Sequence, residues 1–263
     1  MNNNDLFGLE GKTVIVTGGA GYLGSSISEG LAKYGANVMI LSKNKEKCTD
    51  LSGKLNQKYG GQCQGYYADI ADHKSIDETF KEIVTVNKKI DVLVNNACFG
   101  ASGTVEEMTE QEWGKGIEGS INGVFKTTKT ALQYMLKENR GIMINIASMY
   151  GVVSPDPSIY GNSGFNNPPN YGAGKAAIIQ FTRYIACHYG RRGIRANSIS
   201  PGPFPNAEVQ QNKEFIENLN KKTALGRIGK PYELQGIVVY LASDSSSYIT
   251  GQNICIDGGW TAW

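Results

Sequence analysis

Hydrophobic positions along the chain fall into short apolar runs separated by longer amphipathic stretches. The first run, Thr13 to Thr17, is rich in β-branched residues and predicts a strand. Glycines punctuate residues 18–24, and Leu23, Ile27 and Leu31 then recur on one helical face. This segment therefore predicts a strand, a glycine turn and a helix in succession.

The same order of elements recurs over the rest of the chain. The further predicted strands are Asn37 to Ser42, Gln62 to Ala68, Asp91 to Asn95, Ile142 to Ala147 and Ile194 to Ser200. The predicted helices run up to Tyr59 and over Ser75 to Asn87, Gln111 to Glu138 and Tyr171 to Tyr189. Strands that are apolar throughout and alternate with helices favour a parallel sheet covered on both faces. We therefore expect a doubly wound, Rossmann-type α/β fold in a single domain over residues 1–263, because no linker divides the chain.

Composition and charge exclude several classes of partner. The 26 basic and 24 acidic residues give a net charge of +2, and no run of like charge is long enough to follow a nucleic acid or a membrane surface. The five cysteines form no Cys-x-x-Cys pair, which favours neither a disulfide framework nor a zinc site. The polar first residues resemble no export signal. We expect a soluble cytoplasmic protein with no metal, acting on a small molecule.

Two local patterns carry candidate chemistry. The turn from Thr17 to Gly24 follows the first strand directly, where backbone N–H groups and a helix dipole can meet a pyrophosphate. Tyr171 and Lys175 lie one helical turn apart, so the ammonium can lower the pKa of the phenol and make it an acid/base. Ser148 follows the fifth strand, where its hydroxyl can donate to a developing alkoxide.

Several motifs together resemble the short-chain dehydrogenase/reductase superfamily in order and spacing. They are the glycine turn, Asn95-Asn96-Ala97, Ser148, Tyr171-x-x-x-Lys175, Pro201-Gly202 and Asp257-Gly258-Gly259. The resemblance implies an NAD(P)-dependent oxidoreductase that interconverts a secondary alcohol and a ketone, with Tyr171 as the acid/base and Ser148 orienting the carbonyl. It also implies a homotetramer and a substrate lid at about residues 204–222.

The resemblance implies a set of cofactor-binding residues as well. They are Gly18, Gly21, Tyr22, Leu23, Gly24, Ser42, Lys43, Asp69, Ile70, Asn95, Ala97, Lys175, Pro201, Gly202, Phe204 and Asn206. At the end of the second strand, an acid would bind the 2′-hydroxyl of the adenosine ribose and a cation would accept a 2′-phosphate. Ser42-Lys43 stands there without an acid. We therefore expect a preference for NADP(H), with NAD(H) as the alternative.

Three departures from the family pattern matter. The glycine turn reads Thr-Gly-x-x-Gly-x-x-Gly, which resembles the longer, sugar-nucleotide-modifying branch, although the chain has the length of the short branch. Ser148 and Tyr171 are 23 residues apart, so about ten residues are inserted between them, within the irregular segment 154–170. Ser120 occupies the fourth catalytic position, which is usually Asn.

The insert suggests a substrate class. Residues 148–153, the insert and residues 258–263 resemble oxidoreductases of bacterial surface-sugar pathways, which favours a sugar, a polyol or a modified-sugar precursor. The insert is expected to shape the substrate pocket and to bind hydroxyls through its Asn162, Ser163, Asn166 and Asn167; the alternative is a surface loop. Two other functions stay open: a 3-oxoacyl-(acyl-carrier-protein) reductase and a non-catalytic dinucleotide-binding sensor.

Overall fold

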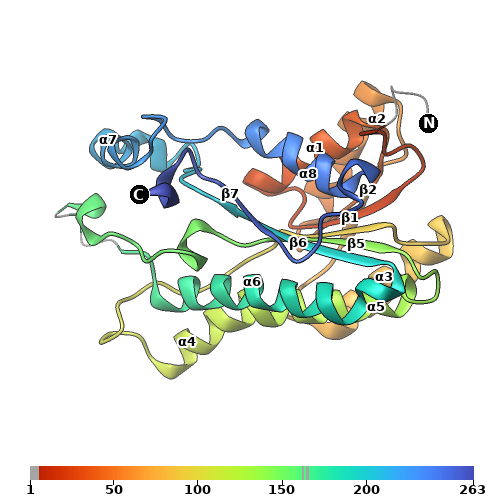
Figure 1. Cartoon of the computed structure of the whole chain (residues 1–263), viewed down its shortest axis with the longest axis horizontal. Coiled ribbons are helices and arrows are strands. Elements are labelled where there is room, and N and C mark those ends of the chain that lie inside the picture. The colour runs from red at the N-terminus through yellow and green to blue at the C-terminus, as the bar shows by residue number, and fades with distance from the viewer. Residues whose placement is uncertain (1–5, 162, 164–165) are drawn as a thin grey trace.

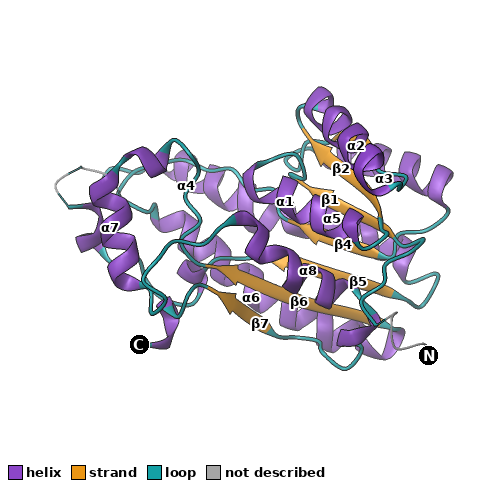
Figure 2. Ribbon diagram, turned by 90° about the horizontal axis from the view of Figure 1, so that it is seen from above, coloured by secondary structure: helices purple, strands orange, loops and turns teal. Residues whose placement is uncertain are grey.

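The computed structural model describes residues 6–161, 163 and 166–263, and within these ranges seven parallel strands form one sheet (Figure 2). Their spatial order is β3-β2-β1-β4-β5-β6-β7. The strands are β1 Thr13–Thr17, β2 Asn37–Ser42, β3 Gln64–Tyr67, β4 Val92–Asn95, β5 Gly141–Ile146, β6 Ile194–Pro201 and β7 Asn253–Ile256. The order reverses between β1 and β4, so a crevice for a ligand is expected at their carboxyl ends.

Helices cover both faces of the sheet (Figure 1). On one face lie α1 Tyr22–Lys33, α2 Lys45–Tyr59 and α8 Gln235–Ala242. On the other lie α3 His73–Asn87, α4 Glu110–Ile117, α5 Gly123–Met135 and α6 Pro169–Tyr189. Val14 and Val16 belong to one apolar core and Ile15 to the other, which explains why β1 is apolar at every position. Among the described residues, no helix is long and apolar enough to cross a membrane.

The doubly wound parallel fold predicted from the sequence is confirmed, and several details needed correction, among them the helices Lys213–Lys222 and Gln235–Ala242, which were not predicted. The third strand begins two residues later than expected, at Gln64. The short strand β7, which pairs with β6, was not predicted. The long helix predicted from Gln111 is not uniform, because a π-helical segment, Glu118–Asn122, separates α4 from α5.

A further apolar cluster lies away from the sheet. Its buried members are Met149, Ile159, Leu219 and Trp260. They come from the turn after β5, the insert, the helix α7 (Lys213–Lys222) and the chain end, which gather at one end of the molecule (Figure 1). We call this group the lid cluster. It joins the insert to α7 and to the end of the chain.

Candidate active site

The carboxyl ends of strands β1, β4, β5 and β6 meet at one cavity of about 420 Å³. Most of its lining was predicted from the sequence: Gly18, Gly21, Tyr22, Leu23, Gly24, Ala97, Ser148, Tyr171, Lys175, Pro201, Gly202 and Phe204. The remaining lining residues are Asn96, Cys98, Ile146 and Ala147. The glycine turn and the candidate catalytic residues therefore face the same space.

The glycine turn forms an open cradle at the start of α1. Gly18 has a φ of 62°, which favours glycine, and a Cβ placed on Gly24 would lie only 2.0 Å from the carbonyl oxygen of Gly18. Within the described chain, no side chain caps the N-terminus of α1 and no acid occupies its first turn. Backbone N–H groups and the helix dipole are thus available to an anionic pyrophosphate.

Asn96 supports this cradle, a role that the sequence reasoning missed. Its Nδ2 donates to the carbonyl oxygens of Thr17 and Gly18 at 3.0 and 3.1 Å. The predicted Asn95 is instead buried away from the cavity lining, where its Nδ2 donates to Oδ1 of Asn145 at 2.8 Å. Asn95 ties β4 to β5, and its predicted contact with the cofactor stays a prediction.

The candidate catalytic residues converge on the carboxyl end of β5. Lys175 is 4% exposed, and its Nζ donates to the carbonyl oxygen of Ile146 at 2.8 Å. The same Nζ lies 5.5 Å from the centre of the Tyr171 ring. The Ser148 Oγ accepts the backbone N–H of Tyr150 at 3.1 Å, which leaves the hydroxyl proton able to point into the cavity.

Ser120 lies behind this group. It stands in the π-helical segment, and its Oγ donates to the carbonyl oxygen of Gly116 at 2.7 Å, which is the backbone contact expected of a mid-helix serine. A Cβ on Gly174 would come within 2.1 Å of that Oγ, so Ser120 packs against α6 one residue before Lys175. Asn122 donates to Glu118 instead and does not replace it.

A second cavity of about 190 Å³ adjoins the first and shares Gly18, Ala97 and Cys98 with it. Its walls are otherwise formed by Thr17, Leu41, Ser42, Lys43, Ala68, Ile70 and Phe99. The two cavities together suit an extended dinucleotide, with the apolar walls of the smaller one beside an adenine.

Lys43 stands at the rim of the second cavity. Its Nζ lies 2.8 Å from Oδ2 of Asp69 and 5.6 Å from the centre of the Phe99 ring, while 62% of its side chain is exposed. The hydrogen bond to Asp69 raises the pKa of Lys43. Burial opposes ionisation of Asp69, yet the bond to Lys43 and the backbone N–H of Ala71 leave the pKa of that carboxyl below its usual value. The ammonium is therefore charged and anchored.

The loop after β6 forms the opposite rim of the first cavity. Phe204 lines the cavity, and the Tyr22 Oη donates to the carbonyl oxygen of Pro205 at 2.9 Å, which links the start of α1 to this loop. Asn206 lies outside the lining, where its Oδ1 accepts the N–H of Val209 at 2.9 Å. Its predicted contact with the cofactor stays a prediction, as does that of Asp69.

The sheet topology and the cavity at its switch point define a dinucleotide-binding protein of the doubly wound class. A family model described as enoyl-(acyl carrier protein) reductase matches residues 19–261. The chain is 35% identical to a 3-oxoacyl-(acyl-carrier-protein) reductase of Thermotoga maritima, with 95% of this chain and 98% of that protein covered. It is 33% identical to a sorbose reductase of Schizosaccharomyces pombe, over 97% of this chain and 98% of that protein.

A solved structure shows the same likeness. The gluconate 5-dehydrogenase of Burkholderia cenocepacia, in complex with NADP and tartrate, superposes with a TM-score of 0.90 at 27% identity and covers 98% of both chains. The chain therefore belongs to the short-chain dehydrogenase/reductase superfamily and is a nicotinamide-dependent oxidoreductase.

Proposed function

We propose that the protein interconverts a secondary alcohol and a ketone with NADP(H), using Tyr171 as the acid/base. The observation that carries this proposal is the buried ammonium of Lys175 beside the Tyr171 ring, in the cavity that also holds the glycine turn. In a general acid/base step, a neighbouring cation stabilises the negative charge that develops on the phenol oxygen.

Each residue of the group has a distinct task. The Ser148 hydroxyl donates to the substrate oxygen, and the Tyr171 phenol gives it a proton during reduction or takes one during oxidation. The Lys175 ammonium stabilises negative charge that develops on the Tyr171 oxygen and binds the ribose hydroxyls of the cofactor. When bound, the nicotinamide supplies or accepts the hydride. Ser120 supports a water-linked path that returns protons towards Lys175, since its hydroxyl both donates and accepts.

The preference for NADP(H) is argued from Lys43. Its exposed ammonium, anchored by Asp69, would bind a 2′-phosphate, and Ser42 supplies no carboxylate that would bind a 2′-hydroxyl instead. The NADP complex of the similar gluconate 5-dehydrogenase supports the same choice. NAD(H) is the alternative.

For the substrate we favour a sugar, a polyol or a modified-sugar precursor. The similar sorbose reductase and gluconate 5-dehydrogenase support this class by their names. The second candidate is reduction of 3-oxoacyl chains on acyl carrier protein, which the likeness to the Thermotoga maritima protein favours. That acidic partner would require a basic docking patch, and no basic run stands out along the sequence.

We also propose how the enzyme is assembled and where it acts. The expectation of one domain is supported by the single sheet, and residues 204–222, which include most of α7, would serve as its substrate lid. The family resemblance supports a homotetramer. The free cysteines of the described chain support a location in the reducing cytoplasm. Sedimentation equilibrium of the purified protein tests the tetramer, and a monomer at micromolar concentration would contradict it.

The decisive experiment follows cofactor oxidation with a panel of ketoses, diketones and 3-oxoacyl thioesters. Reduction of any ketone by the parent protein separates an enzyme from a sensor, which would bind cofactor without turnover. In Tyr171→Phe, which keeps the ring, we expect turnover to fall by roughly 100-fold or more with little change in cofactor affinity. Near-normal turnover in that variant would remove Tyr171 from the mechanism.

A further inference from the structure

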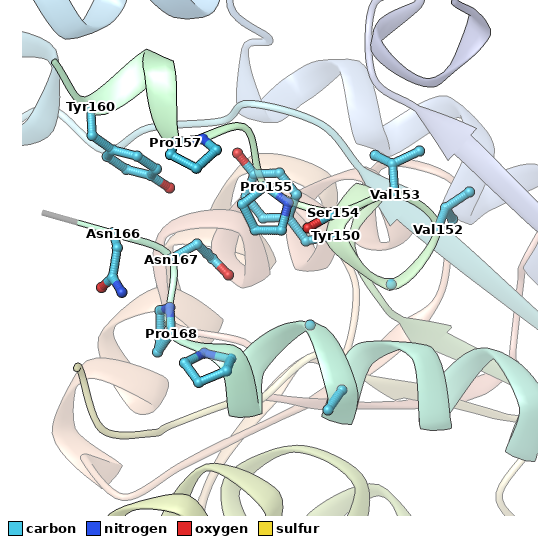
Figure 3. A pocket seen from close by; sticks show the side chains of 14 residues that line it. Tyr150, Val152, Val153, Ser154, Pro155, Pro157, Tyr160, Asn166, Asn167 and Pro168 are labelled. Atoms are coloured by element: carbon cyan, nitrogen blue, oxygen red, sulfur yellow. The ribbon is translucent and has the colours of Figure 1, made fainter. Parts of the chain in front are cut away.

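A separate cavity of about 520 Å³ lies between the insert and the first turns of α6 (Figure 3). Its walls come from the turn after β5, from both ends of the insert and from Gly172 and Ala173 on α6. Residues 162, 164 and 165 of the insert lie outside the described residues. The volume is within the range of about 300 to 1,000 Å³ that small-molecule sites occupy.

The lining carries no acidic or basic side chain among the described residues, and four of its members are prolines. The sequence agrees with this lack of charge, because residues 157–174 contain no Asp, Glu, Lys, Arg or His. The nearby charge of Asp156 is already paired with Lys222 on α7. Since a buried charge without a partner is costly, this cavity disfavours a phosphate, a carboxylate or an ammonium group.

One buried acceptor in the cavity wall needs a donor. The Oδ1 of Asn167 is inaccessible to solvent and finds no hydrogen-bond donor within the described chain. Figure 3 shows the Asn167 side chain extending from just before α6 towards the space beneath Pro155 and Tyr150. Asn166, by contrast, already donates to the carbonyl oxygen of Gly103. A rotation of the half-buried Asn167 side chain into the cavity would let a ligand hydroxyl or N–H satisfy its oxygen, whereas an apolar ligand would leave the oxygen unpaired.

Tyr150 connects this cavity to the reacting centre. It lines the cavity and stands two residues after Ser148. Burial raises the pKa of the Tyr150 phenol well above its usual range, and the phenols of Tyr160, which is hydrogen-bonded to it, and of Tyr171 add to the effect. The Tyr150 phenol is therefore protonated at neutral pH and lies close to the catalytic one.

The lid cluster holds this wall in place. Tyr150 packs edge-on against Trp260 with ring centres 6.4 Å apart, and Tyr160 stacks on Phe215 of α7 at 5.4 Å. The amide of Asn218 donates to the carbonyl oxygen of Ile159 at 3.2 Å. The insert is thus anchored by aromatic and hydrogen-bond contacts from α7, which is how a preformed binding wall is built.

We propose that this cavity binds the distal part of the substrate, an uncharged ring that bears hydroxyl or amide groups, as in a glycoside. Aromatic and proline faces suit the C–H faces of such a ring, while Asn167, Ser154 and the two phenols supply hydrogen bonds. The inference rests on the proposed function and deepens it, because it disfavours a substrate with an anionic distal group such as a phosphate or a sugar acid.

Binding is tested first, on the protein with cofactor bound. The probes are methyl β-D-glucopyranoside and its charged counterpart methyl β-D-glucuronide, followed by saturation-transfer NMR. We expect the glucoside alone to bind, and Asn167→Leu to weaken it by roughly five-fold or more, the worth of one hydrogen bond. The same variant should raise the Tm of the ligand-free protein, because it removes an unpaired buried acceptor. Gln57→Met, an equivalent change on the exposed surface of α2, should alter neither value.

Turnover separates this inference from the proposed function. With the β-D-glucopyranoside of hydroxyacetone as substrate, which carries a ring beyond its ketone, Asn167→Leu should raise KM by roughly five-fold with kcat unchanged, whereas reduction of the small ketone butane-2,3-dione should be unaffected. Equal binding of the two glycosides, no glucoside binding, or equal losses with both ketones would overturn the proposed subsite. Glucoside binding without turnover of any ketone would overturn the proposed function and leave the subsite standing.

Discussion

Gly24 offers the sharpest test of the phosphate cradle. A Cβ added at this position would lie 2.0 Å from the carbonyl oxygen of Gly18 and 2.8 Å from Nδ2 of Asn96. Carbon and oxygen atoms pack at about 3.5 Å, so Gly24→Ala has to displace α1 from the turn by roughly 1.5 Å. The closest of these atoms, the carbonyl oxygen of Gly18, belongs to the backbone and cannot rotate away as a flexible side chain would.

The size of the effect follows from this displacement. Overpacking costs about 3 kcal/mol at the upper end of its range, and alanine returns about 1 kcal/mol of helix propensity. The net loss in the free energy of unfolding is therefore about 2 kcal/mol. The affinity for NADPH should also fall, by on the order of 100-fold, because a shift of this size misaligns the N–H groups that would bind the pyrophosphate.

Gly53 provides the matched control. It lies on the exposed side of α2, and no described atom is within 4 Å of a Cβ built there. Gly53→Ala should stabilise the protein by about 0.5 to 1 kcal/mol and leave cofactor binding unchanged. Urea unfolding measures both stabilities, and quenching of protein fluorescence measures the Kd of NADPH. Parent-like NADPH affinity in Gly24→Ala would refute the assignment of this turn as the pyrophosphate site.

Three further predictions concern single side chains. Lys43→Asp should shift the ratio of kcat/KM for NADPH over NADH by roughly tenfold or more towards NADH, and an unchanged ratio would mean that Lys43 does not meet the 2′-phosphate. Ser120→Ala should increase the solvent isotope effect on kcat; if it behaves like the parent and Ser120→Asn adds nothing, Ser120 is a bystander. The bond to Lys222 lowers the pKa of Asp156 from 3.8 to about 2, so the contribution of this ion pair to stability is complete above about pH 4 and lost as the pH falls towards 2. Asp156→Asn should lack that part of the acid dependence in urea unfolding, and an identical dependence would show that the ion pair adds nothing.

The central strands could be predicted because their burial leaves little ambiguity. Val14, Ile15 and Val16 are fully buried from both faces of the sheet, so the apolar run alone identifies the strand. Strand β7, with four half-buried residues at the sheet edge, has no such local signal. Its partner β6 begins about 60 residues earlier in the chain, and only the folded sheet brings the two together.

The candidate site could be predicted where a motif names a residue, but a motif does not choose between neighbouring residues. Asn95 and Asn96 are adjacent in the same motif, and a strand end directs successive side chains to opposite sides. The sequence does not say which side faces the cofactor crevice, and the structure turns Asn96 towards it. The cavity beneath Tyr150 was equally hidden, because its wall depends on Trp260 and Phe215, which are distant in sequence.

Among the described residues, the lid cluster shares no member with the cores that cover the sheet. Substitutions among its members therefore reshape the substrate side without disturbing the packing that holds the cofactor crevice together. Substitutions in the lid cluster can therefore change the shape of the substrate pocket with little effect on the stability of the sheet and its covering helices. This independence is compatible with the likeness of the chain, along nearly its entire length, to both a sorbose reductase and a 3-oxoacyl-(acyl-carrier-protein) reductase. Directed evolution of new ketone specificity should accordingly begin with the insert, α7 and the last residues of the chain.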